Sequence, residues 1–432
     1  MSIPKSALEP QDLWGSSWER TRTVDESVIK DITERDPILM KLLYEATMET
    51  KRMESKAKRI TTWRNGPFMR MSFSSPGCRY KCIMCNYGSG TKLTPDEIPA
   101  IMKGPLQEVR DTHVNEVLIG TYGSILDPYE MSLDTLSAIC AELRAVPEIA
   151  TVILETRYDM ICDDDLNTLR TELLPDKELI IEMGLESAND DIRARLHKDI
   201  DLNGFKRSID CIHSHGIGVE VNVLLGAPGL SMHDQMLDIL DAVITVMWAL
   251  DVANADGVTI FPVNVKTGTP LHAMYENGKY APPYGWAGIE ILNTLPSDYW
   301  PRISFSWYGD PQSIGDGSNV VAPPIMCDHC RDLLVDFYGN WNAHRGDNQY
   351  RDMLLQIVNE HTCECRKAMI DNLKARRKSP IMTGWRPMTA EDFNARLELL
   401  KKESAENPNQ RPAIVIDSVE AASGVTMDKG GD

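Results

Sequence analysis

The sequence predicts an α/β fold in which a parallel sheet with crossover helices carries the reactive loops. Short apolar segments alternate with amphipathic helical segments from residue 68 onward, as in consecutive βαβ units. Polar and glycine-containing turns follow these segments, as expected where functional loops lie at the carboxyl ends of parallel strands. We therefore expect four parts: a helical extension at 1–66, a barrel-like domain at 67–275, a substrate- or metal-binding region at 276–403 and a flexible tail at 404–432.

Local patterns predict the elements in chain order. Within the extension, apolar residues recur at helical spacing: Ile38, Leu39, Leu42, Leu43 and Met48. Six apolar runs bounded by polar turns then predict strands at 68–73, 116–120, 150–155, 179–185, 218–225 and 257–262. The segment 280–324 is rich in proline, glycine and tryptophan and is expected to be irregular, with a helical region after it.

Composition and charge restrict the class of function. The 432 residues are 42% hydrophobic and 25% charged, which is typical of soluble globular proteins. Neither a secretion signal nor an apolar run of membrane-spanning length is present, so we expect a cytoplasmic location and no membrane partner. The net charge of −19 argues against an extended nucleic-acid surface and suits a cationic small molecule. Six basic residues in 51–64 could contact RNA locally, but a solvated helix face is the favoured interpretation.

Three cysteines with the spacing C-x3-C-x2-C give the strongest chemical signal. Cys78, Cys82 and Cys85 place three thiolates within eight residues, directly after the first predicted strand. A [4Fe–4S] cluster takes four thiolates, so three of them leave one iron open to another ligand. Structural zinc needs four ligands, which this segment alone does not supply, and three close thiols cannot all pair as disulfides. The spacing therefore favours an iron–sulfur cluster that performs chemistry.

Five segments with polar or small residues follow the later strands, at 120–127, 154–159, 184–189, 222–229 and 262–270. They offer close backbone approach, carboxylates and a guanidinium, all of which suit a polar ligand. Because the carboxyl ends of parallel strands meet at one edge, these segments are expected to converge on one site.

The cysteine spacing and these segments, in this order, resemble the motifs of the radical S-adenosylmethionine (SAM) superfamily. The likeness is strongest to the branch of the Elongator catalytic subunit and the methylthiotransferases, and it covers roughly residues 66–275. It implies a partial (β/α)6 TIM-like barrel, a [4Fe–4S] cluster on Cys78, Cys82 and Cys85, and SAM as the cofactor. It also implies an electron donor of the flavodoxin or ferredoxin type.

The resemblance implies which residues contact SAM. Two positions depart from the family pattern: the loop after the second strand lacks the usual glutamate, and Tyr158 stands where a proline is usual. The residues at SAM-contacting positions are Gly123, Ser124, Glu155, Arg157, Glu186, Ser187, Arg195, Ala227 and Pro228.

A second group of cysteines lies in the C-terminal region. It consists of a C-x2-C pair and a C-x-C pair: Cys327, Cys330, Cys363 and Cys365. Four thiolates in two close pairs suit a tetrahedral zinc ion, and they also suit an auxiliary iron–sulfur cluster. His329 and His361 are alternative ligands. Four ordinary cysteines without a metal remain a third interpretation.

The leading hypothesis is an enzyme that abstracts a hydrogen atom from a small, polar, cationic substrate resembling an amino sugar. The charge balance and a general likeness suggest the radical diol dehydratases of aminoglycoside antibiotic biosynthesis, in which an acid–base group assists the loss of water. The candidates for this group are Asp127, Tyr122, Glu182 and Asn222. The alternatives are a tRNA-modifying enzyme, a peptide-modifying enzyme with an auxiliary cluster, and a non-catalytic iron–sulfur sensor.

Overall fold

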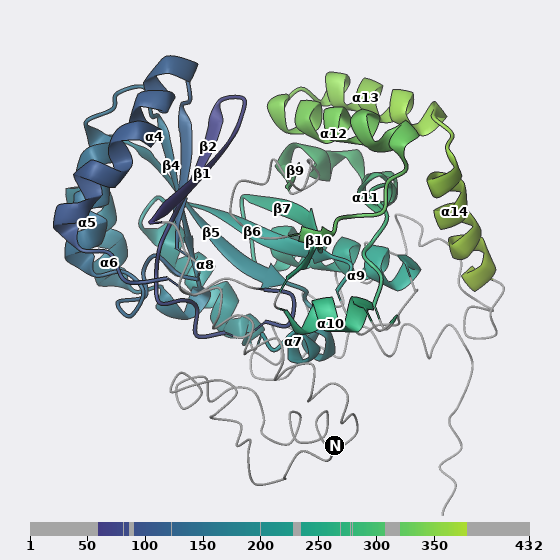
Figure 1. Ribbon diagram of the computed structural model, residues 1–432, viewed down its shortest axis with the longest axis horizontal. Coiled ribbons are helices and arrows are strands. Elements are labelled where there is room, and N and C mark those ends of the chain that lie inside the picture. The colour runs from purple at the N-terminus through teal and green to yellow at the C-terminus, as the bar shows by residue number, and fades with distance from the viewer. Residues whose placement is uncertain are drawn as a thin grey trace, which may run out of the picture.

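An eight-stranded sheet organises the part of the chain that the computed structural model describes (Figure 1). That part is 59–377 without 81, 86–89, 122, 199, 228–234, 268, 277, 279 and 307–319. The predicted helices before residue 59 and the predicted tail after residue 403 lie outside the described residues. Within the described part, no helix is long and apolar enough to cross a membrane.

The strands lie in the sheet in chain order, as expected for successive βαβ units. The sheet runs β1 (Ile60–Asn65), β2 (Phe68–Phe73), β3 (Glu116–Gly120), β4 (Thr151–Thr156), β5 (Glu178–Glu186), β6 (Gly218–Leu225), β7 (Gly257–Pro262) and β9 (Ile303–Phe305). Only the β1–β2 pair in this sheet is antiparallel. The curled parallel sheet confirms the predicted partial barrel, and all six predicted strands are present to within one residue at each end.

Two unexpected strands extend the sheet at its edges. The prediction of a helical extension is wrong at β1, where β-branched Ile60, Thr61 and Thr62 favour an extended chain. Gly66, with a φ of +58°, then turns the chain into β2. At the other edge, β9 pairs in parallel with β7 although it follows the predicted domain end at residue 275. The sheet therefore runs past both boundaries that we expected for the barrel domain.

Helices cover the outer face of the sheet, and α4 and α5 stand together at one end of it (Figure 1). The first of these, α4, buries Ile98, Met102, Leu106 and Val109, which recur every three or four residues. The helices up to residue 294 are α4 (Ile98–Thr112), α5 (Leu133–Arg144), α6 (Asp163–Thr168), α7 (Asp190–Arg195), α8 (Leu202–Ser214), α9 (Gln235–Met247), α10 (Pro270–Glu276) and α11 (Ala287–Thr294). A separate two-stranded sheet pairs β8 (Val265–Lys266) with β10 (Val320–Ala322).

The strands place alternate residues in two different environments. Outward-facing side chains such as Met69, Val117 and Val221 are fully buried in the apolar core beneath the helices. Their neighbours along the chain, such as Arg70 and Glu220, point to the inner side of the sheet and line a cavity. This period of two is the ordinary consequence of the strand pleat. The sheet therefore has one apolar face, which is buried beneath the helices, and one polar face, which lines the cavity.

The first of the C-terminal helices packs on the open edge of the sheet at β9, and the last packs on α9 (Figure 1). The C-terminal helices are α12 (Asp328–Ala343), α13 (Asn348–Glu360) and α14 (Glu364–Arg377). On α12, the Asn342 amide accepts from the backbone N–H of Phe305 at 2.9 Å and donates to its carbonyl at 2.6 Å. The side chain thereby replaces a neighbouring strand for this residue of β9. One end of α12 is thus fixed to the sheet edge.

Candidate functional site

The inner face of the sheet encloses a cavity of about 380 Å³ that extends to the cysteine loop. Its walls come from the inner face of the strands along much of their length, from the loops that follow them and from the end of α12. Nine residues that the sequence predicts for the site line this cavity: Cys78, Cys82, Cys85, Gly123, Glu155, Arg157, Glu182, Glu186 and Asn222. Tyr122 and Pro228, also predicted for the site, lie outside the described residues.

The cysteine loop lies directly against the loop that follows β3. A Cβ atom added to Gly123 would lie 2.5 Å from the Cβ of Cys78 and 2.7 Å from its Cα. Distances of this kind do not occur between real side-chain and backbone atoms, so only glycine permits this approach. The two loops therefore form one wall at the cysteine end of the cavity.

We expect Gly123→Ala to reduce the iron that the protein retains after reconstitution by several-fold, because the new methyl group displaces Cys78 from its place. Gly104→Ala is the matched control, since a Cβ there meets nothing within 4 Å and the residue lies inside α4. The control should keep its iron, and it should gain no stability from helix propensity, because the following Pro105 disfavours a helical residue that carries a Cβ. Iron per chain and the unfolding midpoint measure both effects. Full iron loading in Gly123→Ala would show that the close approach is not required.

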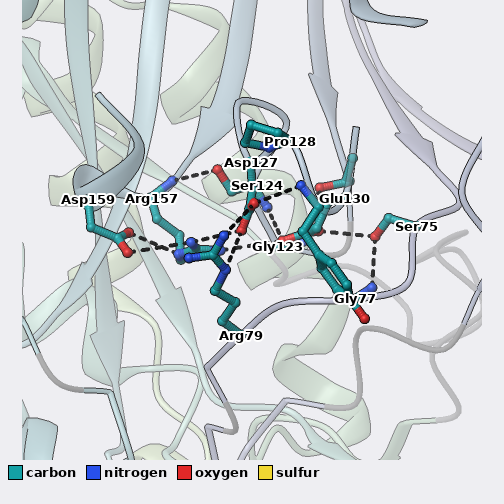
Figure 2. A network of polar contacts seen from close by, with 12 residues as sticks. Ser75, Gly77, Arg79, Gly123, Ser124, Asp127, Pro128, Glu130, Arg157 and Asp159 are labelled. Atoms are coloured by element: carbon teal, nitrogen blue, oxygen red, sulfur yellow. Dashed lines mark hydrogen bonds and ion pairs between the residues drawn. The ribbon is translucent and has the colours of Figure 1, made fainter. Parts of the chain in front are cut away.

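A network of buried ion pairs connects the cysteine loop to the loops after β3 and β4 (Figure 2). Asp127 is fully buried and accepts from Arg79 and from Arg157, each at 3.0 Å. Arg157 also pairs with Asp159 at 2.9 Å and with Glu130 at 3.4 Å. Because Arg79 directly follows the first cysteine of the loop, Asp127 holds that loop to the sheet.

Glu130 anchors the chain just before the cysteine loop (Figure 2). Its carboxylate accepts from the hydroxyls of Ser75 at 3.0 Å and Thr121 at 2.8 Å, and from the backbone N–H of Ser124 at 3.0 Å. The Ser75 hydroxyl in turn accepts from the N–H of Gly77 at 3.2 Å. Burial raises the pKa of Glu130, while the hydrogen bonds from Thr121 and Ser124 oppose that shift. Glu130 is therefore a second residue that positions the loop.

These contacts bear on two sequence predictions. Asp127 was a candidate acid–base group, but both carboxylate oxygens are committed to arginines and it is not among the described residues that line the cavity. Ser124, a candidate SAM contact, is fully buried and shares a hydrogen bond of 2.6 Å with the hydroxyl of Thr156. Both residues position the loops of the site, and Arg157, which does line the cavity, is paired with carboxylates of the protein.

Glu186 and Lys198 form a second charged wall near the cysteines. The ammonium of Lys198 donates to Oε1 of Glu186 at 2.5 Å, whereas Oε2 of Glu186 is buried without a hydrogen-bond partner. Glu186 adopts a φ of +70°, a left-handed conformation that costs free energy for a non-glycine residue. A Cβ on Gly184 would lie 2.5 Å from Nζ of Lys198 and 2.9 Å from Oε1 of Glu186. The left-handed conformation of Glu186 and the absence of a side chain at Gly184 together allow this carboxylate to line the cavity.

Three other residues that the sequence predicts to contact SAM do not reach the cavity in the described structure. Ser187 is fully buried and donates to Asp241 at 2.9 Å, behind the sheet. Arg195 is exposed at the end of α7, because that short helix turns its side chain to solvent. Ala227 packs in a small apolar cluster that includes Ile83. Arg195 therefore stays a prediction that the described structure does not support, whereas Lys198 lines the cavity near the cysteines.

The middle of the cavity contains three carboxylates on neighbouring strands. Glu155 pairs with Arg70 at 2.8 Å, and Glu220 pairs with Arg345 at 3.2 Å. Glu182 lies between them in the sheet without a cationic partner and accepts from the Asn222 amide at 2.6 Å. Burial raises the pKa of Glu182 to about 8, and the negative charges of Glu155 and Glu220 add to the increase. Glu182 is thus a carboxylic acid that holds its proton at neutral pH.

The residues around the cavity fit a [4Fe–4S] cluster and SAM. The thiols of Cys78, Cys82 and Cys85 line one end, and three thiolates leave one iron of a cube for SAM. The unpartnered Oε2 of Glu186 nearby can accept from an amino or hydroxyl group of the cofactor. Cys78, Cys82 and Cys85 would hold the cluster, and Glu186 with Glu155 would contact SAM.

Several cavity residues escape motif-based prediction. Arg70, Glu220, Thr259 and Arg345 line the interior, but no family motif contains them. For the first three, the sequence does carry a signal, because each is a polar residue that interrupts an apolar strand at inward-facing spacing. Arg345 follows α12 and meets Glu220 across 125 residues, which no local pattern reveals.

The second group of cysteines also comes together, away from the cavity. The sulfur atoms of Cys327, Cys330, Cys363 and Cys365 all lie within 4.8 Å of one another. His329 and His361, the alternative ligands, do not belong to this group; their rings stack on each other with centroids 5.1 Å apart.

Comparison with known proteins is consistent with this site. Residues 72–241 match the family model described as the radical SAM superfamily. The chain is 28% identical over 272 residues to the archaeosine synthase subunit beta of Methanosarcina acetivorans, covering 61% of this chain and 75% of that protein. It is 27% identical over 226 residues to the subunit of the same name from Thermococcus kodakarensis, covering 50% and 68%.

The solved structures that match this chain are more distant. The archaeal Elp3 of Methanocaldococcus infernus gives a TM-score of 0.40 at 15% identity, covering 56% of this chain and 59% of that one. Methylornithine synthase gives a TM-score of 0.37 at 11% identity, covering 84% and 98%.

Proposed function

Because this chain carries a domain of the radical SAM superfamily, which binds a [4Fe–4S] cluster and SAM, we propose that it acts on a small, polar, cationic substrate held in the cavity. When bound, the cluster and SAM supply a 5′-deoxyadenosyl radical that abstracts a hydrogen atom from the substrate, and a reductant must deliver the electron. An amino sugar has the required chemistry. Radical dehydration is the reaction that we propose for it.

The observation that carries this proposal is the set of unpaired polar atoms around the cavity. Oε2 of Glu186, Oδ1 of Asn222 and Oδ1 of Asn264 are buried and have no hydrogen-bond partner. Buried polar atoms are nearly always paired in native proteins, so a bound molecule is expected to satisfy them. All three atoms are acceptors, which calls for a ligand rich in N–H and O–H donors. Glu186 would serve SAM, and the two asparagines would serve the substrate.

Glu182 is the residue that we propose for acid–base work. Loss of water from a substrate radical needs a proton on the departing hydroxyl group, and a carboxylic acid with a pKa near the working pH is suited to give it. Glu182 is protonated at neutral pH and lines the cavity. The amide of Asn222 orients its carboxyl group. Of the three central carboxyl groups, Glu155 pairs with Arg70 and Glu220 pairs with Arg345. Glu182 is the one for which the described structure gives no ion pair.

The raised pKa of Glu182 predicts a pH dependence of stability. The native pKa of about 8 lies above the usual 4.5, so the native state holds this proton more tightly than the unfolded chain. Wild-type protein therefore loses stability as pH rises from about 4.5 to about 8, and Glu182→Gln should lack that loss. The unfolding free energy of the variant minus that of wild type should therefore increase by on the order of 4 kcal/mol over this pH range. Denaturant unfolding at several pH values measures the difference.

Glu148→Gln is the control for this experiment, because Glu148 is an exposed carboxylate at the protein surface. Its unfolding free energy should follow the wild type at every pH. If Glu182→Gln also runs parallel to wild type between pH 4.5 and 8, Glu182 is ionised in the native protein and cannot be the proposed acid.

A second candidate function is modification of tRNA. It is favoured by the similarity to the archaeosine synthase subunits beta, which extends over 75% and 68% of their lengths. The net charge of −19 argues against it, since RNA binding requires a local excess of basic residues. The basic run before β1, which could provide one, lies largely outside the described residues.

One experiment separates these two functions. Reduced enzyme with SAM is incubated with amino sugars, with the neutral sugars in which a hydroxyl replaces each amine, or with tRNA transcripts, and 5′-deoxyadenosine is quantified. The proposal predicts that amino sugars raise its yield several-fold over the neutral sugars and that tRNA has no effect. Stimulation by tRNA alone would overturn the proposed substrate class and establish the second function.

A further inference from the structure

The four C-terminal cysteines form a cluster that is distinct from the cavity and its three cysteines. Neighbouring sulfur atoms lie 3.5 Å apart between Cys327 and Cys330, 3.2 Å between Cys330 and Cys365, and 3.4 Å between Cys363 and Cys365. All four sulfur atoms lie within 4.8 Å of one another. None of the four cysteines is in a disulfide. Their convergence therefore needs another explanation.

The spacing of the sulfur atoms suits one metal ion better than a cluster. Zinc–sulfur bonds of about 2.3 Å place four tetrahedral thiolates about 3.8 Å apart, which is close to the observed separations. In a [4Fe–4S] cube each thiolate binds a different iron at an outer corner, so the sulfur atoms must spread farther apart. A two-iron cluster likewise separates its two pairs of thiolates on opposite sides. The compact group matches four ligands around a single ion.

The local structure holds the ligands in place. Cys327 and Cys330 begin α12, and Cys363 and Cys365 begin α14. Arg366 donates to the backbone carbonyls of residues 358, 359 and 361 at 2.7–3.0 Å, which fixes the chain that leads into the second pair. Cys330 is fully buried and Cys365 is 9% exposed. The ligands are thus gathered at the start of two helices and largely shielded from water.

We propose that these four cysteines bind a single structural zinc ion in a closed tetrahedral site. All four positions are filled by the protein, so none is left for a substrate or water, as in structural zinc sites generally. The ion ties the start of α12 to the start of α14. The opposite end of α12 supplies Gly339, Asn342 and Ala343 to the cavity wall. Zinc therefore holds the helix that closes the cavity, without taking part in the chemistry.

Metal analysis of the full-length protein tests this proposal. Wild-type protein, reconstituted without oxygen, should contain about one zinc ion and about four irons per chain. Cys82→Ala should lose the iron and keep the zinc, and Cys363→Ser should lose the zinc and keep the iron. Cys363 is chosen because it is only partly buried and tolerates a hydroxyl better than Cys330 would. Cys162→Ser, at an exposed cysteine outside both groups, is the control and should keep both metals.

A spectroscopic test does not depend on any variant. Protein produced with cobalt in place of zinc should show the intense visible absorption and sulfur-to-cobalt charge transfer of tetrahedral Co²⁺ with thiolate ligands. About eight irons in wild type, a loss of iron in Cys363→Ser, a single iron in place of zinc, or wild type without zinc would each overturn the proposal. Because zinc content is measured apart from SAM cleavage, the result is independent of the proposed function.

Discussion

Cys82→Ala is expected to abolish cluster binding, reducing the iron at the cavity to background. Cys82 lines the cavity together with Cys78 and Cys85, and a cube that is held by two thiolates instead of three has lost a protein ligand that SAM cannot replace. The reduced variant should therefore show no electron paramagnetic resonance signal of a [4Fe–4S] cluster. Iron analysis and that signal measure the effect.

Cys162→Ala is the matched control for this loss, because Cys162 is exposed and lies before α6, outside both cysteine groups. It should retain wild-type iron and the wild-type signal. If Cys82→Ala keeps four irons and an unchanged signal, the three cysteines are not the cluster ligands, and the assignment of the site fails.

Arg157→Leu is expected to destabilise the protein by about 3–5 kcal/mol, because it removes a buried guanidinium that pairs with two buried carboxylates and leaves Glu130 with neutral donors alone. The Arg157 side chain is 5% exposed, and the carboxylates of Asp127 and Glu130 that it pairs with are fully buried. Removing one partner of a buried ion pair costs far more than the pair itself contributes. Denaturant unfolding of the reconstituted protein measures the change.

Arg207→Leu is the control, since Arg207 also pairs with an aspartate, Asp201, but both side chains are more than half exposed. Its loss should cost less than about 1 kcal/mol. Equal effects for Arg157→Leu and Arg207→Leu would mean that the network in Figure 2 does not hold the loops as described.

Sequence patterns were sufficient for the six central strands, because each is a continuous apolar run that ends in a polar turn. They failed at the edges of the sheet for identifiable reasons. β1 contains two threonines and an arginine and lies next to a basic run, so its apolar character is weak. β9 has three residues, too few for any periodicity to be recognised. Edge strands of this kind are fixed by the strand or helix beside them.

In the site, the cysteines and the carboxylates of Glu155, Glu182 and Glu186 could be predicted, whereas the partners of each side chain could not. Asp127 and Glu130 are both acidic residues in the loop after β3, and nothing local shows that they face Arg157, about thirty positions away. The same limit applies to Arg195, which is exposed, and to Lys198, which lines the cavity. Which of two cations near a helix end reaches the cavity depends on where that helix stops, and α7 stops at Arg195.

The central claim is that this chain cleaves SAM reductively at the cysteine loop, and formation of 5′-deoxyadenosine tests it most directly. Wild-type protein is reconstituted with iron and sulfide without oxygen, reduced with dithionite and incubated with SAM, with Cys82→Ala as the blank. We predict 5′-deoxyadenosine and methionine from the wild type and neither product from the variant. Wild-type protein that carries its full cluster yet forms no more 5′-deoxyadenosine than the blank would contradict the account and indicate a non-catalytic iron–sulfur protein.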